Sequence, residues 1–149
     1  MSHRMHLIAA AVAAAFAVTG YAQTGQRTLS EQTQESAARQ IEAEHKAALD
    51  RCATLRDNAV DVCRAEADGR RRVAEARLQL ERRNTSENLQ GLARAQANAQ
   101  YRVENERCDN LQGEASKACQ KQAQMNRDKA EAAIQDDRER SGSAGSGRR

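Results

Sequence analysis

The chain has 149 residues, a formal net charge of +3, four cysteines, and no proline or tryptophan. Of the 127 residues from Gln23 onward, only 16 are Leu, Ile, Val, Met or Tyr while 22 are alanine, which excludes a large hydrophobic core and leaves no strand signal. Because good helix formers dominate and the net charge is too small to favour disorder, the composition predicts an all-α protein that depends on cross-links for stability.

The first 22 residues resemble a secretory signal peptide. Arg4 precedes an apolar stretch over residues 7–18, and Gly20 and Ala22 are the small residues that a signal peptidase accepts. The apolar stretch is shorter than the roughly 20 residues of a membrane-spanning helix, and no cysteine follows it closely enough to carry a lipid. We therefore expect cleavage before Gln23, a periplasmic location, and a mature protein that does not span the membrane.

Sparse breaks divide the rest of the chain into helical segments. Ser30 is a candidate cap for the first helix, Asn58 with Asp61 resembles a capping box, and Gly113 suits a left-handed residue that ends a helix. A further break lies at 84–87. The segments between the breaks are about 30–56, 59–83, 86–112 and 115–140.

These near-equal lengths favour four antiparallel helices in an up-down order. Residues 23–140 then form a single domain, built of two repeats at about 30–83 and 86–140. Residues 141–149 are rich in Ser and Gly, a composition that predicts a disordered tail.

The repeats are defined by their cysteines. Cys52 and Cys63 are separated by ten residues, as are Cys108 and Cys119, and a leucine lies three residues after the first cysteine of each pair. In an exported chain of this size, such a pattern indicates a disulfide framework. Zinc is disfavoured because structural zinc sites bring ligands two to four residues apart, and a redox role is disfavoured because no Cys-x-x-Cys is present.

Two disulfide arrangements remain open. If the chain turns within each motif, the bonds are Cys52–Cys63 and Cys108–Cys119. If each half is one continuous helix, the cysteines of a pair lie about 16 Å apart and must bridge the halves of one long hairpin, as Cys52–Cys119 and Cys63–Cys108. Apolar residues continue at heptad-like steps through the first motif, as in a coiled coil. We favour local pairing because breakers lie at both motif centres.

The doubled motif, the leader and the alanine-rich helices resemble a family of small exported Gram-negative bacterial proteins of unknown function. The motif of that family reads Cys-x2-Leu-x-Gly-x-Ala-Lys-x2-Cys. The second copy in this chain keeps the glycine and alanine as Gly113 and Ala115, whereas the first has Asp57 and Ala59, and both copies lack the lysine. The resemblance covers most of the mature chain and implies a periplasmic protein, without implying an activity.

No set of residues in the chain predicts catalysis, a cofactor or a metal site. His45 is expected to be solvated on a polar helix face, with no serine or cysteine partner. Carboxylate clusters arise by default in a chain with 30% charged residues. We therefore expect a protein that is not an enzyme.

Arginine is concentrated in the second predicted helix, where a candidate anion-contact face would comprise Arg64, Arg70, Arg71, Arg72 and Arg77. Acidic residues four positions away can neutralise much of this charge, in the pairs Glu66–Arg70, Asp68–Arg72 and Glu81–Arg77. A solvated, salt-bridged surface is therefore the preferred interpretation. Nucleic acid is disfavoured as a partner because aromatic stacking residues are scarce.

The sequence thus favours an exported periplasmic helical protein with a structural or binding role. The partner is not identified by any motif; other envelope proteins or anionic envelope polymers are the candidates. The alternative is a stress or chaperone-like protein that shields unfolded clients.

Overall fold

The computed structural model describes the backbone of residues 19–146 and the side chains of residues 30–141. Within these residues the protein is all-α and has no strand. The four helices are α1 (Thr19–Cys52), α2 (Asn58–Arg82), α3 (Ser86–Cys108) and α4 (Gly113–Ser146). Residues 1–18 of the expected signal peptide lie outside the described part of the chain.

The chain divides within α1, between Glu35 and Ser36, into two compact units. The first unit supplies only helical residues of α1 to the described structure. The second, from Ser36 onward, contains the C-terminal part of α1, the helices α2, α3 and α4, and both disulfides.

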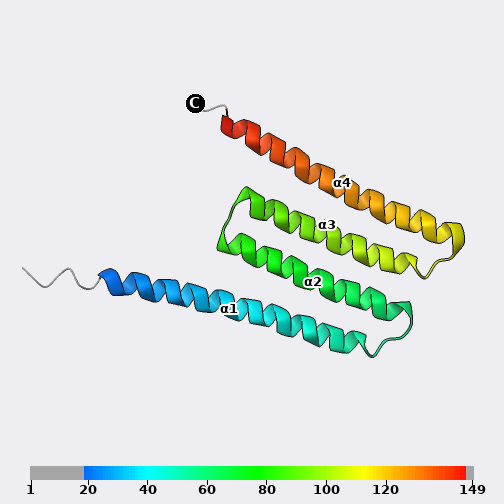
Figure 1. Ribbon diagram of the computed structural model, residues 1–149, viewed down its shortest axis with the longest axis horizontal. Coiled ribbons are helices and arrows are strands. Elements are labelled where there is room, and N and C mark those ends of the chain that lie inside the picture. The colour runs from blue at the N-terminus through cyan, green and yellow to red at the C-terminus, as the bar shows by residue number, and fades with distance from the viewer. Residues whose placement is uncertain (1–18, 147–149) are drawn as a thin grey trace, which may run out of the picture. The chain divides into compact units, whose positions relative to one another are not determined.

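Within the second unit, successive helices lie side by side in chain order (Figure 1). Helix α2 lies between α1 and α3, and α3 lies between α2 and α4. The predicted four-helix up-down arrangement is confirmed, and the alternative of one long two-helix hairpin is wrong. The turns of both cysteine motifs, between α1 and α2 and between α3 and α4, lie at the same end of this unit.

Both disulfides are local, as favoured from the sequence. Cys52 bonds to Cys63 with a Cα–Cα distance of 5.5 Å, and Cys108 bonds to Cys119 with a distance of 5.6 Å. Each bond joins the end of one helix to the second turn of the next. The first cysteine of each pair is completely buried, and each disulfide cross-links its helical hairpin next to the turn.

The two motif turns have the same backbone design. In each turn the leucine N–H donates a hydrogen bond to the carbonyl of the first cysteine, from Leu55 to Cys52 at 3.0 Å and from Leu111 to Cys108 at 3.0 Å. Two residues after each leucine, the backbone has a positive φ, 51° at Asp57 and 59° at Gly113. The glycine position of the motif therefore requires a positive φ. In the first copy of the motif, an aspartate adopts it.

Asp57 occupies a backbone region, with φ 51° and ψ −149°, that is essentially restricted to glycine. Replacing Asp57 with Gly should relieve this strain and raise stability by about 1 kcal/mol after the entropy cost of glycine, or about 4 °C in Tm. Thermal unfolding followed by circular dichroism measures the change. The control is Asp61→Gly, which lies inside α2 and should lower Tm. A Tm reduced by Asp57→Gly would contradict the shared turn design.

Three expected helix ends differ from the structure. Ser30 does not cap the first helix, because α1 already begins at Thr19. Asn58 is not the cap of α2: Asp57 holds that position, without a side-chain cap hydrogen bond. The Asn58 side chain instead joins the two motif turns, donating to the Glu106 carbonyl at 2.8 Å and accepting from Asn110 at 2.8 Å. Gly113 has the left-handed conformation expected, but it begins α4 instead of ending α3.

The turn between α2 and α3 is closed by local hydrogen bonds. Thr85 caps α3 by accepting from the Asn88 N–H, and the Asn88 side chain donates to the carbonyls of Gln79 and Arg83. At the other end of the chain, α4 continues to Ser146, so the expected disordered tail from residue 141 is helical as far as the described residues extend.

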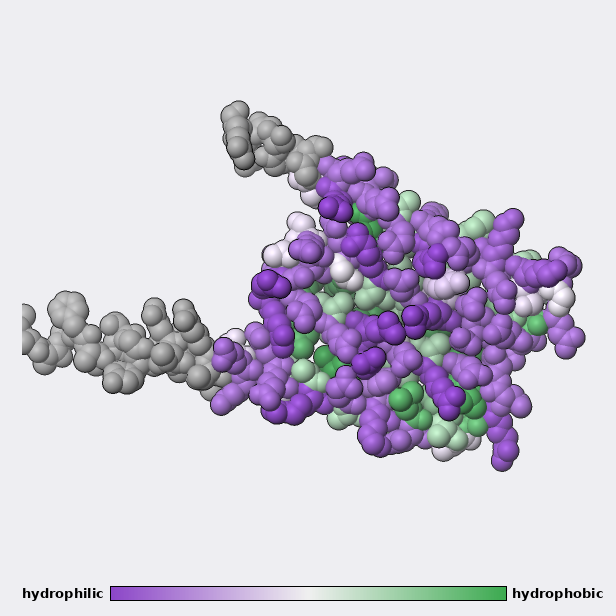
Figure 2. Space-filling view, viewed as in Figure 1, coloured by the Kyte–Doolittle hydropathy of each residue, from purple (hydrophilic) through white to green (hydrophobic). Residues whose placement is uncertain are grey.

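The interior of the second unit is thin. The buried hydrophobic residues are few, and all but one of them are small: Ala48, Cys52, Ala67, Cys108, Ala123 and Ile134. In the face seen in Figure 2, apolar residues form several patches among hydrophilic ones and are not enclosed. Because the sequence has few large apolar residues, the helices bury little side-chain surface, and Cys52 and Cys108 are the most buried side chains.

Candidate functional site

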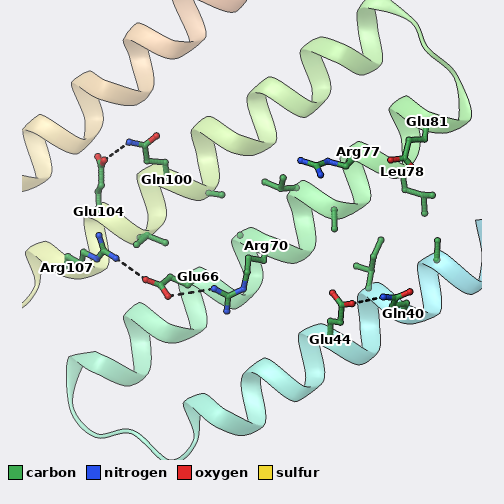
Figure 3. A pocket seen from close by; sticks show the side chains of 17 residues that line it. Gln40, Glu44, Glu66, Arg70, Arg77, Leu78, Glu81, Gln100, Glu104 and Arg107 are labelled. Atoms are coloured by element: carbon green, nitrogen blue, oxygen red, sulfur yellow. Dashed lines mark hydrogen bonds and ion pairs between the residues drawn. The ribbon is translucent and has the colours of Figure 1, made fainter.

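A groove of about 720 Å³ runs along α2 and is bounded by α1 on one side and α3 on the other. Figure 3 shows the side chains that converge on it from these three helices. Its apolar surface comes from Ile41, Val73, Leu78 and Val103, all of them half-buried, together with alanines. From Glu66 to Glu81 the groove follows about 22 Å of α2.

The close approach of α2 and α3 shapes the floor of this groove. Gly69 is buried, and a Cβ placed on it would lie 2.9 Å from the Cβ of Ala99. Only glycine fits at that distance. The two helices therefore pack backbone against side chain here, which leaves the neighbouring Val73 and Val103 to line the open side of the groove.

The rim of the groove has charges of both signs. Glu66 accepts from Arg107 of α3 at 2.9 Å and lies 3.8 Å from Arg70. At the other end of the groove, Arg77 and Glu81 form no ion pair among the side chains that the structure describes. Two charged groups with no partner thus lie beside an apolar surface, an arrangement suited to binding another protein.

The five arginines of the predicted anion-contact face point in three directions around α2. Arg70 and Arg77, seven residues apart, both line the groove. Arg71 is turned toward α1, where it pairs with Glu42 at 3.4 Å and with Glu75 of its own helix at 3.3 Å. Arg64 lies 3.7 Å from Asp61, and Arg72 is exposed. The structure therefore does not bring the five together into one surface.

His45 was expected to be solvated, and that expectation is wrong. Its side chain is only 14% exposed, and its Nε2 lies 2.6 Å from the Asp68 Oδ1 of α2. Asp68 is consequently not the partner of Arg72 that its spacing suggested. The pair holds α1 against α2 beside the small buried residues Ala48 and Ala67.

Tyr101 is the only Phe, Tyr or Trp residue whose side chain the structure describes. The Arg127 guanidinium lies 4.6 Å from the centroid of its ring. This cation–π contact links α3 to α4. The ring face is thereby occupied within the fold.

Two kinds of feature are absent from the described residues. They contain no group of His, Cys, Asp and Glu side chains that could hold a metal ion. Neither do they contain a helix long and apolar enough to cross a membrane.

No protein-family model matches the chain, and no curated protein or solved structure shows significant similarity to it. The function is therefore inferred from the groove, which was not foreseen from the sequence. The only sequence signal for it is the recurrence of apolar residues at 73 and 78 between charged residues at 66, 70, 77 and 81.

Proposed function

We propose that this chain is an exported periplasmic protein with a structural or binding role, and that it acts through the groove over α2. The observation that carries the proposal is the combination of an apolar floor with a rim of charges of both signs. An apolar surface surrounded by polar groups is the usual composition of a protein interface.

The shape of the groove favours a helical or extended partner over a small molecule. A length of about 22 Å corresponds to four helical turns, and the groove is open along one side. Small-molecule sites enclose most of their ligand and have few, convergent polar groups. Helix-in-groove recognition needs a long apolar track, which Ile41, Val73, Leu78 and Val103 supply.

The proposed location is supported by the cysteines and the leader. Both cysteine pairs form disulfides, and structural disulfides persist in oxidising compartments such as the bacterial periplasm. A cleavable signal peptide before Gln23 would deliver the chain there.

Site-specific photo-crosslinking in the exporting cell tests the groove. A benzophenone amino acid at Leu78, inside the groove, is expected to give adducts of defined mass. The same group at Gln79, which is adjacent, exposed and outside the groove lining, is expected to give none. Equal labelling at both positions, or none at Leu78, would contradict binding through the groove.

A chaperone-like role is the alternative, and exposed apolar side chains outside the groove favour it. Leu89 is 57% exposed and Met125 is 48% exposed; flexible methionines suit surfaces that bind many partners. Under this alternative the protein should suppress aggregation of an unfolded client, and Met125→Gln should weaken that protection.

A further inference from the structure

We infer that the groove is covered by a second copy of this chain, so that two helical layers pack face to face around a two-fold axis. The inference rests on the proposed function and names the partner of the same groove. It follows from the layering of the helices, the size of the exposed face, and the order of charges along α2.

The helices of the second unit form one layer, whereas stable domains generally pack two layers around a common core. In Figure 1, α2 is flanked by α1 and α3, and within residues 36–146 no further helix covers these three. The four large apolar residues of the groove stay half-buried for this reason. A second layer would bury these apolar residues and so enlarge the core, which within one chain consists mainly of alanines and cysteines.

The dimensions of the face favour a copy of the layer over a single helix. Three adjacent helices, each about 10 Å wide and about 22 Å long, present roughly 660 Å² in projection, whereas one helix about 10 Å wide covers a third of that. Accessible area exceeds projected area because side chains are rough. A layer can therefore approach the roughly 800 Å² per partner of a standard stable interface, whereas a single helix would leave much of the face uncovered.

The charges along α2 are arranged so that a two-fold copy can match them. Within the groove, Arg70 and Glu81 lie eleven residues apart on α2, with the apolar Val73 and Leu78 between them. An antiparallel copy of α2 with its axis between residues 75 and 76 places Arg70 opposite Glu81 of the second copy, and Glu81 opposite Arg70. A two-fold axis makes each such contact twice, and Glu81 has no ion pair within its own chain among the described residues.

Charge reversal in separate chains tests this register. Glu81→Arg places arginine opposite Arg70 at both symmetric contacts, and Arg70→Glu places glutamate opposite Glu81. Each variant alone is therefore expected to dimerise at least about tenfold more weakly than the wild type. An equal mixture pairs opposite charges at both contacts, so it is expected to recover the dimer. Sedimentation equilibrium of the purified mature chain measures all three.

Leu78→Glu removes the apolar contact without depending on the charge register, and Gln79→Glu adds the same charge outside the groove as its control. Leu78→Glu should give a monomer and Gln79→Glu a dimer, with equal helical circular dichroism. A wild-type protein that stays monomeric overturns the inference, as does a dimer that persists in Leu78→Glu or a mixture that does not recover. If the wild type is monomeric while the Leu78 photo-crosslink captures another protein, the second copy is excluded and groove binding stands.

Discussion

Loss of both disulfides is expected to lower Tm by about 24 °C. Each bond closes a short loop and restricts the unfolded chain by about 3 kcal/mol, and 1 kcal/mol corresponds to about 4 °C at this size. The buried core cannot compensate, since its largest fully buried side chains are the cysteines Cys52 and Cys108 themselves.

Paired serine substitutions separate the two hairpins. Cys52→Ser with Cys63→Ser, and Cys108→Ser with Cys119→Ser, should each lower Tm by about 12 °C. Reductant should then affect only the bond that remains, and it should leave the variant without cysteines unchanged. Differential scanning calorimetry with and without reductant provides the values. An unaltered melting curve after complete reduction would mean that the disulfides are not structural.

Substitution of Gly69 by Leu is expected to destabilise the protein by about 3 kcal/mol, or about 12 °C in Tm. A Cβ at this position already lies 2.9 Å from the Ala99 Cβ. The remaining carbons of leucine must therefore force α2 and α3 apart. Chemical denaturation with a far-ultraviolet signal measures the loss.

Gly91 is the matched control, because it lies inside α3 and has nothing within 4 Å of an added Cβ. Gly91→Ala should stabilise by up to about 1 kcal/mol through helix propensity alone. The smaller change Gly69→Ala should be partly rescued by Ala99→Gly, which removes the atom that it meets. If Gly69→Leu and Gly91→Ala shift stability in the same direction, the close approach of α2 and α3 is wrong.

The fold was largely predictable because its determinants are local in sequence. Helix-forming composition fixed the all-α class, and breakers at the centres of both motifs predicted the hairpins and their disulfides. Gly113 was informative because a positive φ is a property of single residues. The same reasoning misplaced the cap of α2, since Asp57 adopts a conformation unusual for its residue type.

The groove and the His45–Asp68 contact were not predictable from one sequence. Each depends on how adjacent helices are rotated about their axes, and in helices this rich in alanine and charge several rotations satisfy the hydrophobic pattern equally well. The four-residue spacing within α2 predicted an ion pair between Asp68 and Arg72. In the structure Asp68 contacts His45 of α1 instead, a residue 23 positions away in the sequence.

The most direct test of the proposal that the chain is exported and folds as two disulfide hairpins is a mass map. The chain is purified from a periplasmic extract without reductant and cleaved at Arg82 or Arg83. We predict an N-terminus at Gln23 and two separate fragments, one closed by Cys52–Cys63 and the other by Cys108–Cys119. A chain that begins at Met1 with alkylatable thiols, or fragments that stay joined until thiol is added, would contradict it.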